Sequence, residues 1–169
     1  DRLFISGPQV LLSDQLPPGY GQDFALSQTG RMFYTKSNAV LEAVWVDRDG
    51  NWTPVDMDNP LRGVRYAVLS PDDTRLAVNS WPNPPKDDGH LWIKELPNGP
   101  FAQFTFEGAV NHRPSWSPDG RSVIFISDRG ENRDIWVKRS DGTKDAEVLL
   151  DESAVIDEAL YSANGEWLV

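Results

Sequence analysis

Few residue combinations in this sequence could support catalysis. The 169 residues contain only two histidines, His90 and His112, and no cysteine. A Ser–His–Asp triad through His112 is formally available, but serine and aspartate are abundant here because turns use them. The motifs G-x-S-x-G and H-E-x-x-H and the phosphate-binding loop are missing. The sequence therefore predicts a chain that is not an enzyme and holds no cofactor.

Two acidic turns have the composition of metal-binding loops. The segment DRDGNW (47–52) has the alternating oxygen ligands that open a calcium loop, whereas a hairpin turn with Gly50 in the left-handed conformation uses the same residues. The segment SDRGENRD (127–134) offers further oxygen ligands in Asp128, Asn132 and Asp134, but pairing of Asp128 with Arg129 or Arg133 across the loop is the better explanation. We favour the structural interpretation in both places and predict no metal site.

Polar side chains at the start of three apolar segments are better candidates for a binding site. They are Arg65, Tyr66, Asn111, His112, Arg113, Asp157 and Glu158. Cations, acids and one histidine in one place would form a polar funnel for a ligand, and His112 would make that funnel sensitive to pH. The alternative is that these side chains are solvated or pair with their neighbours. They can act together only if the fold brings the three segments to one place.

A second candidate is Trp81, at the start of the proline-rich segment SWPNPPKDDGH (80–90). Loops carry binding function more often than the elements they connect, so Trp81 is a candidate contact for a partner protein. A surface loop stiffened by its prolines is the alternative.

Composition restricts the partners. The chain has 26 acidic and 16 basic residues, a formal net charge of −10, and no basic cluster. Such a surface repels phosphate, which argues against nucleic acids and anionic membranes as partners. No apolar stretch approaches the roughly 18 residues that a membrane span needs. We therefore expect a protein or peptide partner and no membrane segment within these residues.

An internal repeat determines the fold. Turn-opening serines recur at intervals of 43, 47 and 45 residues, at Ser27, Ser70, Ser117 and Ser162. Tryptophans recur at intervals of 47 and 44 residues, at Trp45, Trp92 and Trp136. A unit of about 45 residues that carries four short apolar segments separated by turns predicts a four-stranded β-meander.

The third unit shows the strands and the turn most clearly. Its turn, Ser-Pro-Asp-Gly at 117–120, places proline where φ is preset and Gly120 where a left-handed residue is needed. At the same place in the second unit stands Asp73, which tolerates that conformation better than most residues. The next strand, SVIFIS (122–127), is continuously apolar, so both of its faces must be buried. A sheet stacked between two similar sheets meets that requirement, which predicts an all-β propeller with four-stranded antiparallel blades.

The segment RPSWSPDGRSVIFISDRGENRDIWVKRSDGT (113–143) resembles the Asp-containing, WD-like repeat of TolB-like β-propellers, which also occurs in tricorn-type and prolyl-oligopeptidase-type peptidases. The order DRLFISGPQVLL, FALSQTGRMFY, VWVDRDG is in addition similar to propellers attached to bacterial Ser/Thr kinases. The resemblance implies a six-bladed ring. We expect residues 1–169 to form part of it, with boundaries at 1–12 (last strand of a preceding blade), 24–57, 64–106 and 112–150 (three blades) and 156–169 (first two strands of another).

The resemblance implies two alternative functions. The first is a non-catalytic scaffold or sensor that binds a protein or ligand outside the cytoplasm, although a cytoplasmic location also fits the sequence. The second is the substrate-gating propeller of a serine peptidase. Fewer than six blades leave apolar blade faces bare, so we expect either a piece of a longer bacterial protein or an association of copies that closes the ring.

The exposed apolar faces of the terminal blades predict self-association, which can be tested. If residues 1–169 are produced alone, the exposed Trp- and Val-rich blade faces should pair, and light scattering at micromolar concentration should report a dimer or larger species. A monomer at that concentration would contradict the expectation.

Overall fold

The computed structural model describes residues 24–26, 32–37, 41–80, 89–130, 132–154 and 156–169. The strand expected at 1–12 and the candidate contact Trp81 lie outside the described residues. The described part of the chain contains no helix with the length and hydropathy of a membrane span.

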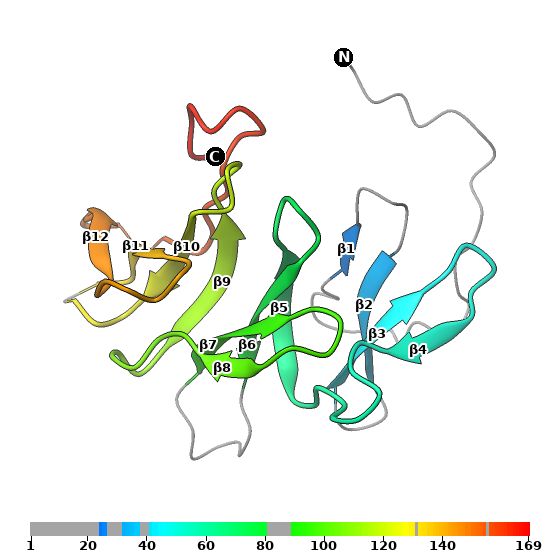
Figure 1. Ribbon diagram of the computed structural model, residues 1–169. Helices are drawn as coiled ribbons and strands as arrows, with labels where there is room; N and C mark the ends of the chain where they lie inside the picture. The colour runs from blue at the N-terminus through cyan, green and yellow to red at the C-terminus, as the bar shows by residue number, and fades with distance from the viewer. Residues whose placement is uncertain (1–23, 27–31, 38–40, 81–88, 131, 155) are drawn as a thin grey trace.

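The described residues form three antiparallel sheets of four strands, and in each sheet the strands pair in chain order. The first contains β1 (Phe24–Leu26), β2 (Met32–Ser37), β3 (Leu41–Val46) and β4 (Trp52–Pro54); the second contains β5 (Val64–Leu69), β6 (Arg75–Ser80), β7 (His90–Glu95) and β8 (Phe101–Gln103); the third contains β9 (Asn111–Trp116), β10 (Ser122–Ser127), β11 (Asp134–Arg139) and β12 (Glu147–Leu150). The sheets stand side by side with the second in the middle (Figure 1). The fold is a partial β-propeller, and each sheet is one blade.

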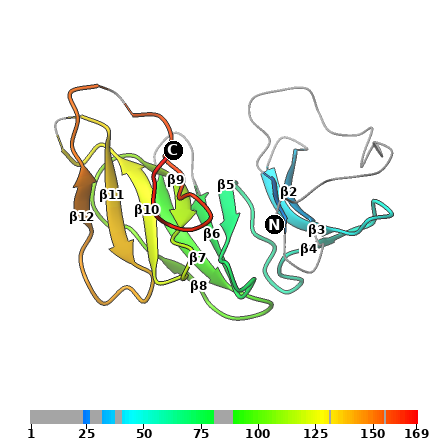
Figure 2. The same ribbon diagram turned by 90° about the horizontal axis from the view of Figure 1, so that it is seen from above.

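The first strand of each blade is its innermost strand. Strand β5 contacts both β1 and β9, so these three strands line one side of the arc, and Figure 2 shows β5 and β9 next to each other from above. The C-terminal segment continues the arc with one antiparallel bridge, between Tyr161 and Leu168. The backbone N–H of Tyr161 donates to Ser115 Oγ at 3.4 Å, which ties this segment to β9.

The serine turns have the predicted conformation. Asp73 has φ 57°, in the same left-handed region as Gly120 at 68° and Gly165 at 73°. In the second blade the Ser70 hydroxyl donates to Asp72 at 2.6 Å and accepts the N–H of Arg75 at 2.9 Å. These turns hold the first and second strands of the second and third blades in register.

One sequence landmark is wrong in register. Trp92 pairs with Val78 and Trp136 with Phe125, each eight residues after the turn serine of its blade. Trp45 pairs with Phe33, which is only six residues after its serine. Trp45 therefore lies two residues further along its strand than the other two tryptophans, because a near-equal spacing in sequence can arise from loops of different length.

The second strands of the second and third blades are buried on both faces, as the sequence predicted for residues 122–127. In β6, Leu76 and Val78 pack in the core between the first two blades, whereas Ala77 faces the core between the second and third. In β10, Val123 and Phe125 share the latter core. The alternate residues Ile124 and Ile126 pack against Ala159 of the C-terminal segment. Strands β6 and β10 are thus each shared between two cores.

Two buried lysines connect successive blades. Lys94 of β7 forms an ion pair with Asp56, in the segment that leaves the first blade, and also donates to the carbonyl of Gly99. Lys138 of β11 reaches back in the same way and donates to the carbonyl of Phe104 at 3.0 Å. Both lysines lie in the third strand of their blade, opposite the residue that pairs with the end of the innermost strand.

The Lys94–Asp56 pair yields a stability prediction. Lys94→Met leaves a buried carboxylate without its counter-ion, and removal of one member of a buried pair is strongly destabilising, so the melting temperature should fall by at least about 5 °C. The double variant Lys94→Met/Asp56→Asn removes the orphaned charge and should recover part of the loss. Calorimetry of the three proteins checks this, and a Lys94→Met variant as stable as the parent would contradict it.

Candidate inner-strand binding site

The residues at the centre of the candidate site occupy the same position of the repeat. Tyr66, Arg113 and Glu158 each lie four residues before the turn serine of their blade. Tyr66 has φ 49° and Arg113 has φ 52°, although neither is glycine. Both occur where the pairing of the innermost strand with the second strand shifts register. A non-glycine residue in this conformation costs about 1–3 kcal/mol, and such strain is concentrated at functional sites.

The strained positions bring side chains of successive blades into contact. The Arg113 guanidinium lies 5.2 Å from the centroid of the Tyr66 ring, and its Nη1 is 3.1 Å from Glu158 Oε1. The ring of His112 meets that of Tyr66 edge-on at 5.8 Å. The inner strands β5 and β9 and the C-terminal segment are therefore linked by one series of aromatic, cationic and acidic groups.

His112 is neutral at pH 7 in this setting. Burial lowers its pKa below 6.5, and the nearby charges of Arg133 and Arg113 lower the pKa further, partly opposed by Asp157. Its Nε2 atom is buried and has no hydrogen-bond partner among the described residues. The His112 imidazole thus has one buried polar atom without a hydrogen-bond partner, close to the charges of two arginines.

Arg133 is a member of the site that the sequence indicated only as an alternative partner of Asp128, not as a binding residue. It lies in the loop between β10 and β11, and its Nη1 is 4.0 Å from Asp157 Oδ1. The only sequence signal was its membership of the acidic turn 127–134. We call the assembled group, Tyr66, His112, Arg113, Arg133, Asp157 and Glu158, the inner-strand cluster.

The remaining predicted residues lie elsewhere. Arg65 is exposed on β5, beside Tyr66. Asn111 is completely buried: its Oδ1 accepts from Ser127 and Arg129, each at 2.9 Å, and its Nδ2 donates to the carbonyl of Glu107 at 2.9 Å. Asn111 is therefore held inside the interface between blades and positions β9.

The acidic turns have structural roles. The Asp47 carboxylate accepts from the N–H of Asn51 and from its side-chain amide, each at 2.9 Å, and Gly50 has φ 85°, so the predicted hairpin turn is confirmed. The expected pairing of Asp128 with Arg129 or Arg133 is wrong. Asp128 accepts the backbone N–H of Val110 at 2.8 Å, and Arg129 pairs with Glu107 at 3.6 Å.

Comparisons with known proteins agree with this architecture. No family model matches the chain. Over 101 residues, 57% of its length, the chain is 36% identical to an uncharacterized peptidase, YuxL, of Bacillus subtilis, and it spans 15% of that protein. TolB from Acinetobacter baumannii superposes with a TM-score of 0.63 at 19% identity, over 86% of this chain and 36% of TolB. The propeller domain of the Trilobed protease from Pyrococcus furiosus superposes with a TM-score of 0.54 at 16% identity, over 76% of this chain and 40% of that domain.

These likenesses define the class of fold. The chain is a β-propeller, as the three stacked meanders already indicate. Within that class its fold is TolB-like, and it is shared with propeller domains of peptidases.

The state of His112 can be tested by titration. Its folded pKa lies below 6.5, so the unfolded chain binds more protons between the folded pKa and 6.5. The His112 contribution to the free energy of unfolding is therefore complete above pH 6.5 and is lost as the pH falls toward the folded pKa. NMR should show His112 titrating below 6.5, and His112→Gln should weaken the pH dependence of stability in this window. A His112 pKa at or above 6.5 would contradict the assignment.

Proposed function

We propose that this chain is a non-catalytic β-propeller module that binds a protein or peptide at the inner-strand cluster. It serves as a scaffold or sensor within a larger protein. The observation that carries the proposal is the pair of left-handed residues, Tyr66 and Arg113, at one repeat position on neighbouring inner strands. Strain retained twice at the same place, with the two side chains in contact, supports selection for binding rather than for stability.

The chemistry of the cluster suits a peptide. Arg113 and Arg133 are cations whose acidic partners, Glu158 and Asp157, are exposed. Partly exposed ion pairs contribute at most about 1 kcal/mol, so a ligand can exchange with them at little cost. The Tyr66 ring adds an apolar surface next to these groups. The charged groups can hydrogen-bond to the backbone and polar side chains of a peptide, and the aromatic ring can pack against an apolar side chain.

The cellular context is part of the proposal. The TolB-like fold supports an extracytoplasmic location, and the net charge of −10 supports a protein or peptide partner rather than a nucleic acid.

Binding can be tested with a peptide array. The protein is probed against an array of random decapeptides, and a selected peptide is titrated by fluorescence anisotropy. Arg113→Gly removes the guanidinium but keeps the left-handed backbone, and it should weaken binding at least about tenfold. Arg121→Ala, an exposed arginine in the turn between β9 and β10, is the matched control and should bind like the parent. Equal binding by all three proteins, or no array signal, would contradict the proposal.

The 36% identity to the Bacillus peptidase favours a second candidate, a substrate-gating propeller. In this case the complete protein hydrolyses peptides in another domain, and the cluster filters substrates by size. Arg113→Gly in the complete protein should alter hydrolysis of casein while leaving cleavage of a dipeptide p-nitroanilide unchanged. A complete protein without hydrolytic activity would eliminate this candidate.

A further inference from the structure

A comparison of the two buried lysines reveals a second site, which shares no residue with the inner-strand cluster. Lys94 has a carboxylate partner, Asp56, in the segment that leaves the preceding blade. Lys138 reaches the corresponding segment of the next interface, but finds there only the backbone carbonyl of Phe104. No ion pair involves Lys138 among the residues that the structure describes.

The Lys138 side chain is nevertheless largely buried. The side chain belongs to the buried set, with a residual exposure of 9%. Its Nζ lies 5.2 Å from the centroid of the Phe104 ring and 5.5 Å from that of Phe106, which gives partial compensation through cation–π contacts. An ammonium group has three N–H donors, and one of them is used by Phe104.

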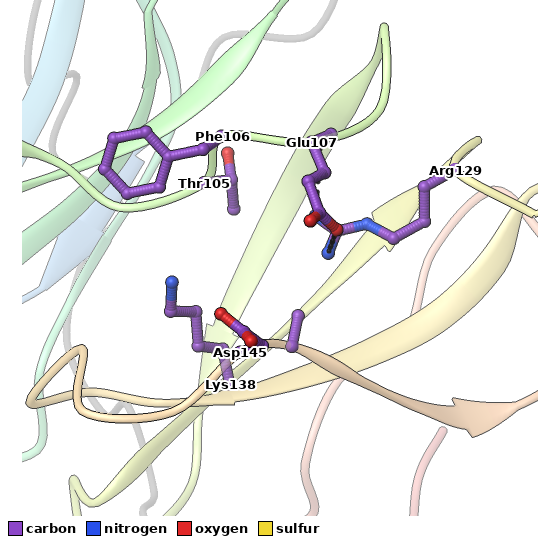
Figure 3. Close-up of a pocket in the computed structure, with 7 residues that line it drawn as sticks. Thr105, Phe106, Glu107, Arg129, Lys138 and Asp145 are labelled. Atoms are coloured by element: carbon purple, nitrogen blue, oxygen red, sulfur yellow. Dashed lines mark hydrogen bonds and ion pairs between the residues drawn. The ribbon is translucent and has the colours of Figure 1, made fainter.

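A small pocket opens at this ammonium group. It has a volume of about 40 Å³, and its lining comprises Thr105, Phe106, Glu107, Arg129, Lys138, Asp145 and Ala146. Figure 3 shows Lys138 directed from β11 toward Thr105, with Glu107 and Arg129 meeting on the other side. Because one water requires roughly 10–15 Å³ of such space, the pocket holds about three waters or one carboxylate group.

Two cations and two carboxylates line the pocket, but only Arg129 and Glu107 are paired with each other. Arg129 is engaged with Glu107 at 3.6 Å and with Asn111 at 2.9 Å. Asp145 lines the pocket as well, but its carboxylate lies outside ion-pair distance of Lys138. The phenyl ring of Phe106, 69% exposed, forms an apolar rim.

We propose that this pocket is a carboxylate-binding subsite in which an acidic side chain of a partner takes the place that Asp56 occupies beside Lys94. The Lys138 ammonium group donates to the incoming carboxylate. The exposed Phe106 ring packs against the aliphatic carbons next to that carboxylate.

The probe for the test is acetate, with acetamide as its neutral isostere. Both are titrated into the intact protein at constant ionic strength, and NMR follows the side-chain ammonium and Cε signals of Lys138 together with the backbone amide signals of Phe106 and Ala146, which line the pocket and remain in every variant. Acetate should shift them saturably and acetamide should not. The acidic side chain itself is represented by N-acetyl-aspartyl amide, which should bind at least as tightly as acetate.

Two lysine variants separate the pocket from the general surface. Lys138→Met fills the same volume without charge and should weaken acetate binding at least about tenfold, because a hydrogen bond to a charged group contributes about 1.5–3 kcal/mol. Lys144→Met, an exposed lysine in the following turn, should bind acetate like the parent. Circular dichroism verifies that both variants are folded.

Three results would overturn the proposal. They are equal shifts with acetate and acetamide, a linear acetate response without saturation, and unchanged acetate affinity in Lys138→Met. A fourth result would overturn it as well. If acetate has no effect on the parent protein, and Asp145→Asn shifts the ammonium and Cε signals of Lys138 in the absence of acetate, the chain's own Asp145 is the partner of Lys138.

Discussion

Burial of the second strand of a blade on both faces is the constraint on which the structure depends. Strands β6 and β10 carry consecutive apolar side chains that point to both faces of their blade. One neighbouring blade can cover only one of these faces. Each blade therefore requires a neighbour on either side. At roughly 25 cal/mol per Å² of apolar surface, the stacking of blades supplies the main favourable free energy that holds the meanders together.

Stacking also determines where polar groups can meet. The innermost strands are forced side by side, and residues at one repeat position then come into contact, as Tyr66 of β5 and Arg113 of β9 do with each other and Arg113 does with Glu158 of the C-terminal segment. At the third strands the same geometry directs Lys94 and Lys138 backward onto the preceding blade. Polar side chains thus recur at equivalent positions of successive interfaces between blades, but their partners differ. Each interface can therefore have its own binding properties.

The sequence predicted the fold better than the site. Turn residues such as Asp73 and the continuous apolar run of β10 report local backbone geometry and burial, and both can be recognised without knowledge of the rest of the chain. The register of Trp45 depends on loop length, and the burial of Asn111 depends on contacts across two blades. The two W-x-K patterns at 92–94 and 136–138 are the feature of the sequence from which the buried lysines could have been predicted.

Native-state hydrogen exchange measures the shared burial most directly. Amides of β6 and β10 belong to different blades but share the core between them, so they should open only together, with the free energy of global unfolding. Amides of the outer strands β4, β8 and β12 should exchange at lower free energy through local fraying. If the β10 amides opened at a free energy well below that of β6, each blade would be an independent unit and mutual burial would not hold the fold together.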